Sequence, residues 1–254
     1  MKMRMKVSTL KAILALLVLA IMAAMAIAAP YGPDTISRDN DQRRTNFDGG
    51  VKQIEAQAGN VTQLTINTTI LTERWQGYYG NISGKVTLDD ANGYTMYDWS
   101  AGSGFAPVGE IYAANQSISS WGDVVCLNLT GNGVVGQDGP NTTILETMYG
   151  MDVDDADGVD ETFTGTKDIV IGTTTLTSCP ATNMYVNNVS QSALWNETLL
   201  LENNTAVSTV IFAAQTEQNA NGFNNQTWDF QMIVGDNGED AIATTTYYFY
   251  VELA

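Results

Sequence analysis

Six carboxylates lie close together in one short stretch of the chain, around Gly158. Closely spaced carboxylates on a loop that contains glycine suit a hard cation such as calcium, which binds several oxygen atoms. The EF-hand pattern does not fit, because Val153 and Thr164 occupy positions where it requires carboxylates. A solvated acidic turn is the alternative. The sequence therefore gives a candidate calcium site, formed by Asp152, Asp154, Asp155, Asp157, Asp160 and Glu161.

Groups for enzymatic catalysis are scarce. The chain has no histidine, so the usual Ser-His-Asp and Cys-His arrangements cannot form. A carboxylate pair can hydrolyse glycosides, but nothing in the sequence singles out one pair among the 28 acidic residues. We therefore expect no enzymatic activity and assign no catalytic residue. Eight aromatic residues could form a platform on which sugar rings stack, but their positions on predicted strands favour a role in the core. They are Trp75, Tyr78, Tyr79, Tyr94, Tyr97, Trp99, Trp121 and Trp228.

Asn-x-Ser/Thr triplets, the acceptor sites for N-linked glycans, occur ten times. Chance would give roughly three or four in a chain of this composition. A glycan is bulky and hydrophilic, so each site that is used must face solvent. The alternative is that Asn and Thr are simply common in β-turns and strands. The predicted acceptors are Asn60, Asn67, Asn81, Asn115, Asn128, Asn141, Asn188, Asn196, Asn203 and Asn225.

The N-terminus has the layout of a secretory signal peptide. A basic start, with four Lys or Arg residues, precedes an apolar run over residues 12–29 that ends in small residues, and cleavage is expected after Ala28. Two alternatives stay open: the run is retained as a membrane anchor, or Lys11-Ala12 is a cleavage site like that of archaeal type IV prepilins. All three place the rest of the chain outside the cell, at the cell surface.

Net charge limits the partners. Residues 1–28 hold four basic residues and no acidic ones, so their removal takes the formal charge from −17 to −21. Such a surface repels nucleic acid and anionic lipid, and it suits divalent cations, a salty medium or simple solubility. We expect no nucleic-acid partner, and membrane contact only through the N-terminal apolar segment if it is uncleaved.

The chain has two cysteines, Cys126 and Cys179. In an exported protein two cysteines most simply form a disulfide, and two free buried thiols are the alternative. A metal site at the cysteines is not expected, because they lie far apart and no histidine accompanies them.

Three segments follow from composition: the signal peptide at 1–28, a polar arm or linker at 29–59, and one β-domain at 60–254. Alternation of apolar and polar residues predicts a first strand at 64–68, and Asn92-Gly93 predicts a hairpin turn between strands at 80–88 and 94–99. Further strands are predicted at 110–114, 168–171, 173–177, 194–201 and 206–214. A final hairpin is predicted to pair 228–234 with 241–253.

Two short helices are predicted, at 119–125 and from a capping box that begins at Thr143 and ends at Gly150. Repeated short strands with turns between them predict an all-β fold, an antiparallel β-sandwich with one or two short helices.

Four segments resemble secreted β-rich surface proteins of archaea: residues 75–84 (WQGYYGNISG), 157–163 (DGVDETF), 179–182 (CPAT) and 246–253 (TYYFYVEL). The resemblance implies an S-layer-associated or filament-type surface glycoprotein. It supplies no catalytic residues.

The leading hypothesis is a non-enzymatic structural glycoprotein of the cell surface, whose partners are further copies of itself or other surface proteins. Residues 60–70 would leave their own sandwich and complete a neighbour's sheet, with Leu64, Ile66 and Ile70 filling pockets. The alternative is that this segment is an ordinary first strand of its own domain. Other candidate functions are a calcium-dependent adhesin, a carbohydrate-binding module and a type IV pilin-like protein.

Overall fold

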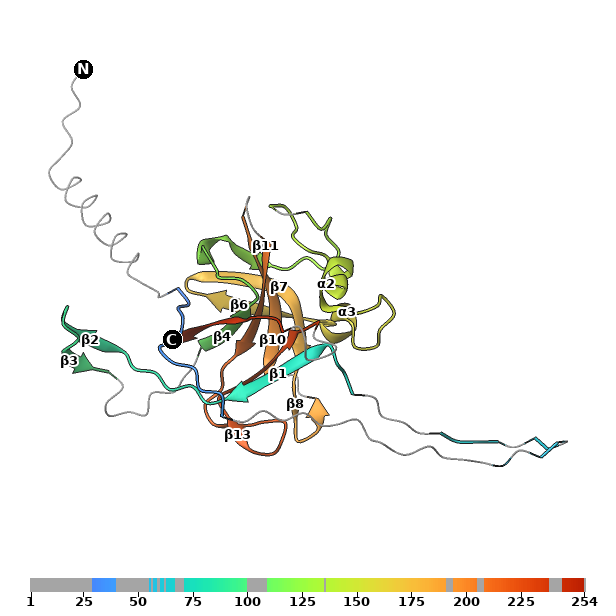
Figure 1. The fold of residues 1–254 in the computed structure, drawn as a ribbon. Coiled ribbons are helices and arrows are strands. Elements are labelled where there is room, and N and C mark those ends of the chain that lie inside the picture. The colour runs from blue at the N-terminus through green and yellow to red at the C-terminus, as the bar shows by residue number, and fades with distance from the viewer. Residues whose placement is uncertain are drawn as a thin grey trace, which may run out of the picture.

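The structure, a computed structural model, describes residues 29–39, 55, 57, 58, 60, 61, 63–66, 71–99, 109–134, 136–190, 194–204, 208–237 and 244–253. The predicted signal segment at 1–28 and the sequon at Asn67 lie outside these residues. Within the described chain no helix is both long and apolar enough to cross a bilayer. The fold is all-β and antiparallel, as predicted (Figure 1).

The larger sheet forms the centre of the molecule. Its strands run in the order β15 (Tyr248–Leu253), β4 (Gly109–Ala114), β11 (Ser208–Gln215), β10 (Asn196–Asn203), β7 (Thr174–Asn183) and β6 (Gly165–Ile171). A further short strand, β5 (Val124–Cys126), also pairs with β10. The apolar runs of β4, β10 and β11 are buried almost throughout, which is typical of strands covered on both faces.

A second, smaller layer covers one face of this sheet. It is an antiparallel pair, β1 (Trp75–Gly80) with β14 (Phe230–Gly235), in the register Trp75↔Gly235 to Gly80↔Phe230. Met232 and Val234 of β14 share one core with Leu199 of β10 and Phe212 of β11. The arrangement is therefore sandwich-like, but its two layers are very unequal in size.

A second core fills the opposite face. Tyr112 of β4, Leu200 of β10 and Ile211 of β11 pack there with residues of β6 and β7. The turn between β6 and β7 reaches the far edge of the sheet, because the backbone N–H of Gly172 donates to Oε1 of Glu252 on β15 at 2.7 Å. One hydrogen bond therefore links the β6–β7 turn to the strand at the other end of the sheet order.

Two helices lie beside the smaller layer. These are α2 (Thr142–Tyr149) and α3 (Val159–Thr162); the second was not predicted from the sequence. Helix α2 ends at Gly150, in the left-handed conformation, as predicted. Its N-cap is Asn141, whose side chain accepts from the N–H of Ile144, and not the predicted Thr143. Glu146 is consequently free of any capping role and points into the protein, where it is 1% exposed.

Three further predictions need correction. Residues 119–125 form a short 3-10 turn, η1 (Trp121–Asp123), followed by β5, because Val124 is drawn into the second core. The last two strands do not form a hairpin: β14 pairs with β1 and β15 with β4, so they enter different layers. The strand predicted at 64–68 is absent from residues 63–66, and residues 67 and 68 lie outside the described chain.

Three small hairpins complete the fold. The predicted Asn-Gly hairpin is confirmed, since β2 (Thr87–Asp89) pairs with β3 (Thr95–Asp98), and Figure 1 shows it extending from the body. Its first strand is shorter than the predicted 80–88, because residues 81–86 form no strand. The others are β8 (Tyr185–Val186) with β9 (Val189–Ser190), and β12 (Ala220–Asn221) with β13 (Thr227–Trp228). The predicted arm begins with a bridge from Tyr31 to Val251, which covers part of the outer edge of β15.

The predicted disulfide is confirmed. Cys126 of β5 and Cys179 of β7 are bonded, with their Cα atoms 4.8 Å apart. Both strands pair with β10, β7 along its first residues and β5 along its last ones. The bond therefore joins two strands that share one neighbour and are distant in sequence.

Candidate functional site

The acidic segment does bring carboxylates together, although only two of the six predicted residues take part. Glu146 of α2 and Asp160 and Glu161 of α3 each offer a carboxylate oxygen, and these oxygens lie within 4.8 Å of one another. Asp160 and Glu161 are exposed, whereas Glu146 is 1% exposed. The cluster thus has a buried floor and a rim that is open to solvent.

Glycine at position 158 makes room for this arrangement. A Cβ atom placed on Gly158 would lie 2.4 Å from Oε2 of Glu161 and 3.0 Å from Oε1 of Glu146. A side chain at this position would therefore displace the carboxylate of Glu161, which is the flexible end of an exposed side chain. Glycine matters here through its small size, since its backbone conformation, with φ at −61°, is open to all residues.

An aromatic contact holds the loop in place. The indole Nε1 of Trp75, at the start of β1, donates to the carbonyl oxygen of Asp157 at 2.7 Å. The Trp75 ring packs against Phe163 and Tyr149, with centroids 6.0 and 6.4 Å away. Tyr149 ends α2 and Phe163 follows α3, so one tryptophan ties β1 to both helices that carry the carboxylates.

Electrostatics at Glu146 are unfavourable for a bare carboxylate. Burial, and after it the neighbouring carboxyl of Asp160, raise the pKa of Glu146 to about 7, although the backbone N–H of Val159 partly offsets them. Neither carboxylate oxygen makes a hydrogen bond of normal geometry in the part of the chain that the structure describes. Three converging carboxylates of this kind call for a proton or a cation between them.

The other four predicted ligands lie outside the cluster. Asp155 uses its carboxylate to accept from the backbone N–H of Asp152 at 2.8 Å, which closes a turn. Asp157 contributes its carbonyl to Trp75, and the side chains of Asp152 and Asp154 are exposed. Glu146 was missed because the capping pattern gave it another role. A signal was present, since it follows the buried Leu145 and lies three residues before the buried Tyr149.

The sequons differ widely in exposure. Five asparagines are exposed: Asn60, Asn81, Asn128, Asn188 and Asn225. Asn115, Asn141 and Asn203 are half-buried, and the last two donate through Nδ2 to the carbonyls of Gly131 and Gln137. Asn196 is 6% exposed, so a glycan there would displace its neighbours. Among the nine described sequons, the five exposed ones are best suited to carry sugar, and their use stays a prediction.

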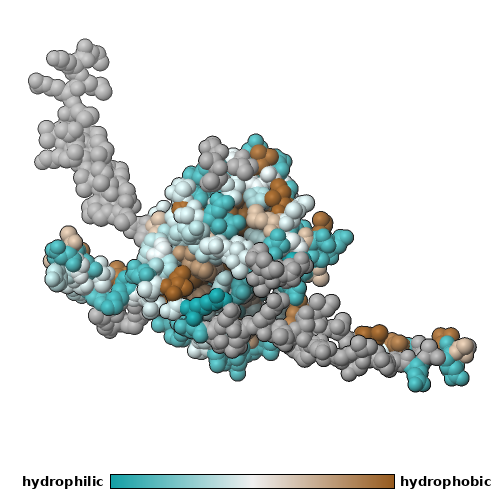
Figure 2. All heavy atoms as spheres, viewed as in Figure 1, coloured by the Kyte–Doolittle hydropathy of each residue, from teal (hydrophilic) through white to brown (hydrophobic). Residues whose placement is uncertain are grey.

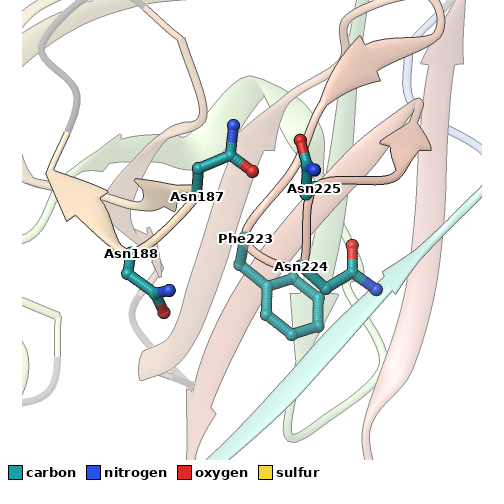
Figure 3. A pocket seen from close by; sticks show the side chains of 5 residues that line it. All are labelled: Asn187, Asn188, Phe223, Asn224 and Asn225. Carbon is teal, nitrogen blue, oxygen red and sulfur yellow. The ribbon is translucent and has the colours of Figure 1, made fainter.

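A hollow of about 530 Å³ lies between two turns of the chain (Figure 3). Four asparagines and one phenylalanine line it: Asn187, Asn188, Phe223, Asn224 and Asn225. The backbone N–H of Asn187 donates to the carbonyl of Gly222, which joins the two turns. Next to the hollow, the ring of Tyr79 lies 5.0 Å from that of Phe223 and 4.8 Å from that of Trp228. Tyr79 and Phe223 are both exposed, so this is a solvent-facing aromatic group beside a row of amides.

The predicted aromatic platform is otherwise split between several places. Trp75 and Tyr78 pack against the first core and Trp121 against the second, as the core alternative predicts. Tyr97 and Trp99 contact each other on the exposed β2–β3 hairpin, where Tyr94 is also exposed. Phe223 was not among the predicted aromatics, because it stands in a turn and not on a strand.

Residues 60–66 are placed unlike an ordinary first strand. Those the structure describes form no strand, and their side chains are exposed; Ile66 is 81% exposed and Leu64 52%. Figure 1 draws this part of the chain away from the sheets, and Figure 2 shows apolar residues along it. Strand β1, which follows in sequence, pairs with β14 on one side and with no other strand among the described residues.

No protein-family model matches the chain, and comparisons with curated proteins and with solved structures give no match either.

Proposed function

We propose that the protein is a non-enzymatic structural glycoprotein of the cell surface whose subunits assemble by strand donation. In this arrangement residues 60–70 of one subunit pair with the free edge of β1 in the next. The observation that carries the proposal is the combination of an exposed, alternating apolar segment with a strand, β1, that pairs with one strand only among the described residues.

The exposure of Leu64 and Ile66 favours donation over an ordinary first strand. A segment that alternates apolar and polar residues is suited to lie on a core with one face. Leu64 and Ile66 would share that face, yet both are in solvent within a single subunit. Burying each side chain against a neighbour is worth about 1.5–3 kcal/mol. The predicted glycan acceptor Asn67 falls on the opposite face, where a sugar would not obstruct pairing.

The unequal layers supply a matching acceptor. The smaller layer has two strands over a much wider sheet, and β1 pairs with β14 alone among the described strands, so the main-chain groups of alternate residues are directed to its other edge. An unpaired edge is a ready template for a strand from another chain. A Cβ atom on Gly77, in the middle of β1, would meet no atom within 4 Å, so there is open space over this face of the strand.

Export is supported by three independent features. The disulfide fits an oxidising compartment, the five exposed sequons fit a glycosylated surface, and the N-terminal sequence fits a signal peptide. The strongly acidic composition is compatible with a crowded extracellular polymer, because it keeps free subunits soluble.

The decisive experiment compares two substitutions within residues 60–70, the segment that would be donated. Ile66→Asp places a charge on the face that would be buried, and Thr65→Asp places the same charge on the opposite face. Both residues are exposed in the single subunit, so neither variant should change its melting temperature. By electron microscopy and light scattering, Ile66→Asp should raise the concentration needed for polymers by more than about tenfold, and Thr65→Asp should not.

Two results would contradict strand donation. One is a wild-type protein, purified from its native source, that stays monomeric at every concentration. The other is an Ile66→Asp variant that polymerises as readily as wild type. A synthetic peptide covering residues 60–70 gives a further check, because it should compete for β1 and cap growing polymers.

A second candidate function, sugar binding, is favoured by the hollow in Figure 3. Exposed aromatic rings stack on the apolar faces of sugar rings, and amides bond their hydroxyls. The rings of Tyr79 and Phe223 beside four asparagines offer both. The sugar is either an external polysaccharide or the protein's own glycan at Asn225, two residues after Phe223.

Three variants separate the two sources. Tyr79→Ala should abolish retention in gels that contain the polysaccharide if the sugar is external, and Tyr94→Ala, on the distant hairpin, serves as the matched control. If the sugar is the protein's own glycan, Asn225→Gln should lower the melting temperature of the glycosylated protein and leave the bare protein unchanged. No effect in either assay would end this second candidate.

A further inference from the structure

We infer that Glu146, Asp160 and Glu161 bind one calcium ion, which bridges α2 and α3 and fixes the loop between them. The site differs from the one that the sequence suggests, because four of the six predicted ligands are absent from it and its floor is a residue from outside the acidic stretch. None of its three ligands belongs to residues 60–70 or to β1, so this site and strand donation are tested by different substitutions.

The buried floor is what makes the cluster more than an acidic surface turn. Glu146 is 1% exposed, and both of its oxygens are inaccessible to solvent and without a hydrogen-bond partner among the residues described. A carboxylate is rarely buried unless it is paired or bonded to a metal. Two more carboxylates, those of Asp160 and Glu161, converge on it, and one oxygen of each of the three residues lies within 4.8 Å of the others.

The ligand chemistry favours calcium over other metals. All three side chains are oxygen donors, and the chain has no histidine and no free cysteine. Three carboxylates supply three to six oxygens, depending on how many bind through both, and water completes the shell from the open rim. Magnesium usually binds one or two carboxylates and keeps most of its water, so it suits this buried floor less well.

The surrounding structure is built to hold these ligands. Gly158 leaves the space in which the two glutamates approach each other, and Trp75 fastens the loop through the carbonyl of Asp157. Met151 and Val159, at the two ends of the loop, are buried in the first core. The loop backbone is thus fixed from below while the carboxylates of Asp160 and Glu161 face solvent, where an ion can enter.

Calcium titration of the chelator-treated, full-length protein tests the site. Isothermal calorimetry with calcium chloride should give one saturable site per chain, and the melting temperature should rise by several degrees at millimolar calcium. Magnesium chloride at the same concentration should give a clearly smaller rise. Asp160→Asn should weaken calcium binding by at least about tenfold.

Asp152→Asn is the matched control, because it removes the same charge from the same acidic segment outside the cluster. It should leave calcium affinity unchanged. Glu146→Gln adds a second readout: it should abolish the calcium response and, at pH 8 without calcium, melt at a higher temperature than wild type, since it removes a buried uncompensated charge.

Three outcomes would overturn the inference. The first is no heat and no change in melting temperature at millimolar calcium. The second is equal weakening by Asp152→Asn and Asp160→Asn, which would mean diffuse attraction to the acidic surface. The third is a Glu146→Gln variant that still responds to calcium as wild type does. Polymer formation is measured separately, so failure of this site leaves strand donation to be judged by its own variants.

Discussion

Glu110 and Glu252 lie directly opposite each other on the paired strands β4 and β15. Directly opposed like charges destabilise an antiparallel pair, so this arrangement needs an explanation. The carboxylate of Glu252 is stabilised by hydrogen bonds, because Oε2 accepts from the hydroxyl of Tyr112 at 3.1 Å and Oε1 accepts from the N–H of Gly172 at 2.7 Å. The carboxylate of Glu110 is destabilised instead: burial, and then the charge of Glu252, raise its pKa to about 7.

The first prediction concerns pH. The pKa of Glu110 is about 7 in the folded protein against an ordinary value of 4.5, so between these values the folded state binds more protons than the unfolded state. The free energy of unfolding contributed by this group therefore falls as pH rises from 4.5 to 7. Glu110→Gln removes the effect. The variant should match wild type near pH 4 and exceed it by on the order of 1 kcal/mol at pH 8, since Glu110 is only partly buried.

Denaturant titration at both pH values measures this difference. Asp123→Asn, at an exposed position on η1, controls for the loss of one negative charge. The same gain at pH 4 and pH 8, or a gain in the control, would show that Glu110 does not bear the proposed burial cost. Lys167 and Asp168 face the same groove as Glu110, so salt should be held constant across the series.

The second prediction concerns the bond between the two layers. Oε2 of Glu197, on β10, accepts from the backbone N–H of Ile233 on β14 at 2.7 Å, and the residue is fully buried. Burial holds the pKa of Glu197 well above its ordinary range, so its neutral form is favoured. Glu197→Gln should therefore cost less than about 1 kcal/mol, whereas Glu197→Ala leaves an unpaired N–H and a cavity and should cost about 3 kcal/mol. Chemical unfolding at pH 7 distinguishes the two; equal costs would contradict the hydrogen bond's role.

The third prediction concerns the disulfide. Cys126 and Cys179 are 53 residues apart, and closing a loop of that length is worth about 4 kcal/mol in the chain-entropy model. The double variant Cys126→Ser, Cys179→Ser should melt about 10 °C below wild type. Reductant should bring wild type down to the same temperature and leave the variant unchanged. A variant that melts with wild type would mean that the strands around β10 hold themselves in place without the bond.

The fourth prediction separates the two roles of Trp75. Trp75→Phe keeps an aromatic ring in the first core but removes the hydrogen bond to the carbonyl of Asp157. Losing one such bond should lower stability by about 1 kcal/mol. If the loop positions the calcium ligands, calorimetry should also show a several-fold weaker affinity for calcium. Tyr78→Phe, which leaves this loop bond intact, should keep the wild-type affinity; equal affinities in all three proteins would contradict the role of the loop bond.

Local sequence signals predicted the elements that depend on neighbouring residues. Asn92-Gly93 gave the β2–β3 turn, Gly150 gave the end of α2, and apolar runs gave β10 and β11. Each of these depends on local conformational preference or on burial along one element. The all-β class and the disulfide followed from the same information.

Pairing over long distances could not be predicted in this way. Gly235 to Gly238 reads as a hairpin turn, but the strands around it join different layers because each finds a better partner far away in sequence. Alternation at residues 64–68 predicts a face that can be buried, and it says nothing about which chain buries it. The cluster at Glu146 likewise depends on the packing of α2 against α3, which no spacing along the sequence encodes.

The covalent link between Cys126 and Cys179 has a consequence for proteolysis. Every peptide bond between the two cysteines lies inside a closed ring that includes α2, α3 and the proposed calcium ligands. One cut anywhere in that ring leaves two fragments that remain tethered. Such a nicked subunit should run at full length on a non-reducing gel and as two bands after reduction, so a polymer would lose no mass from a single cleavage there.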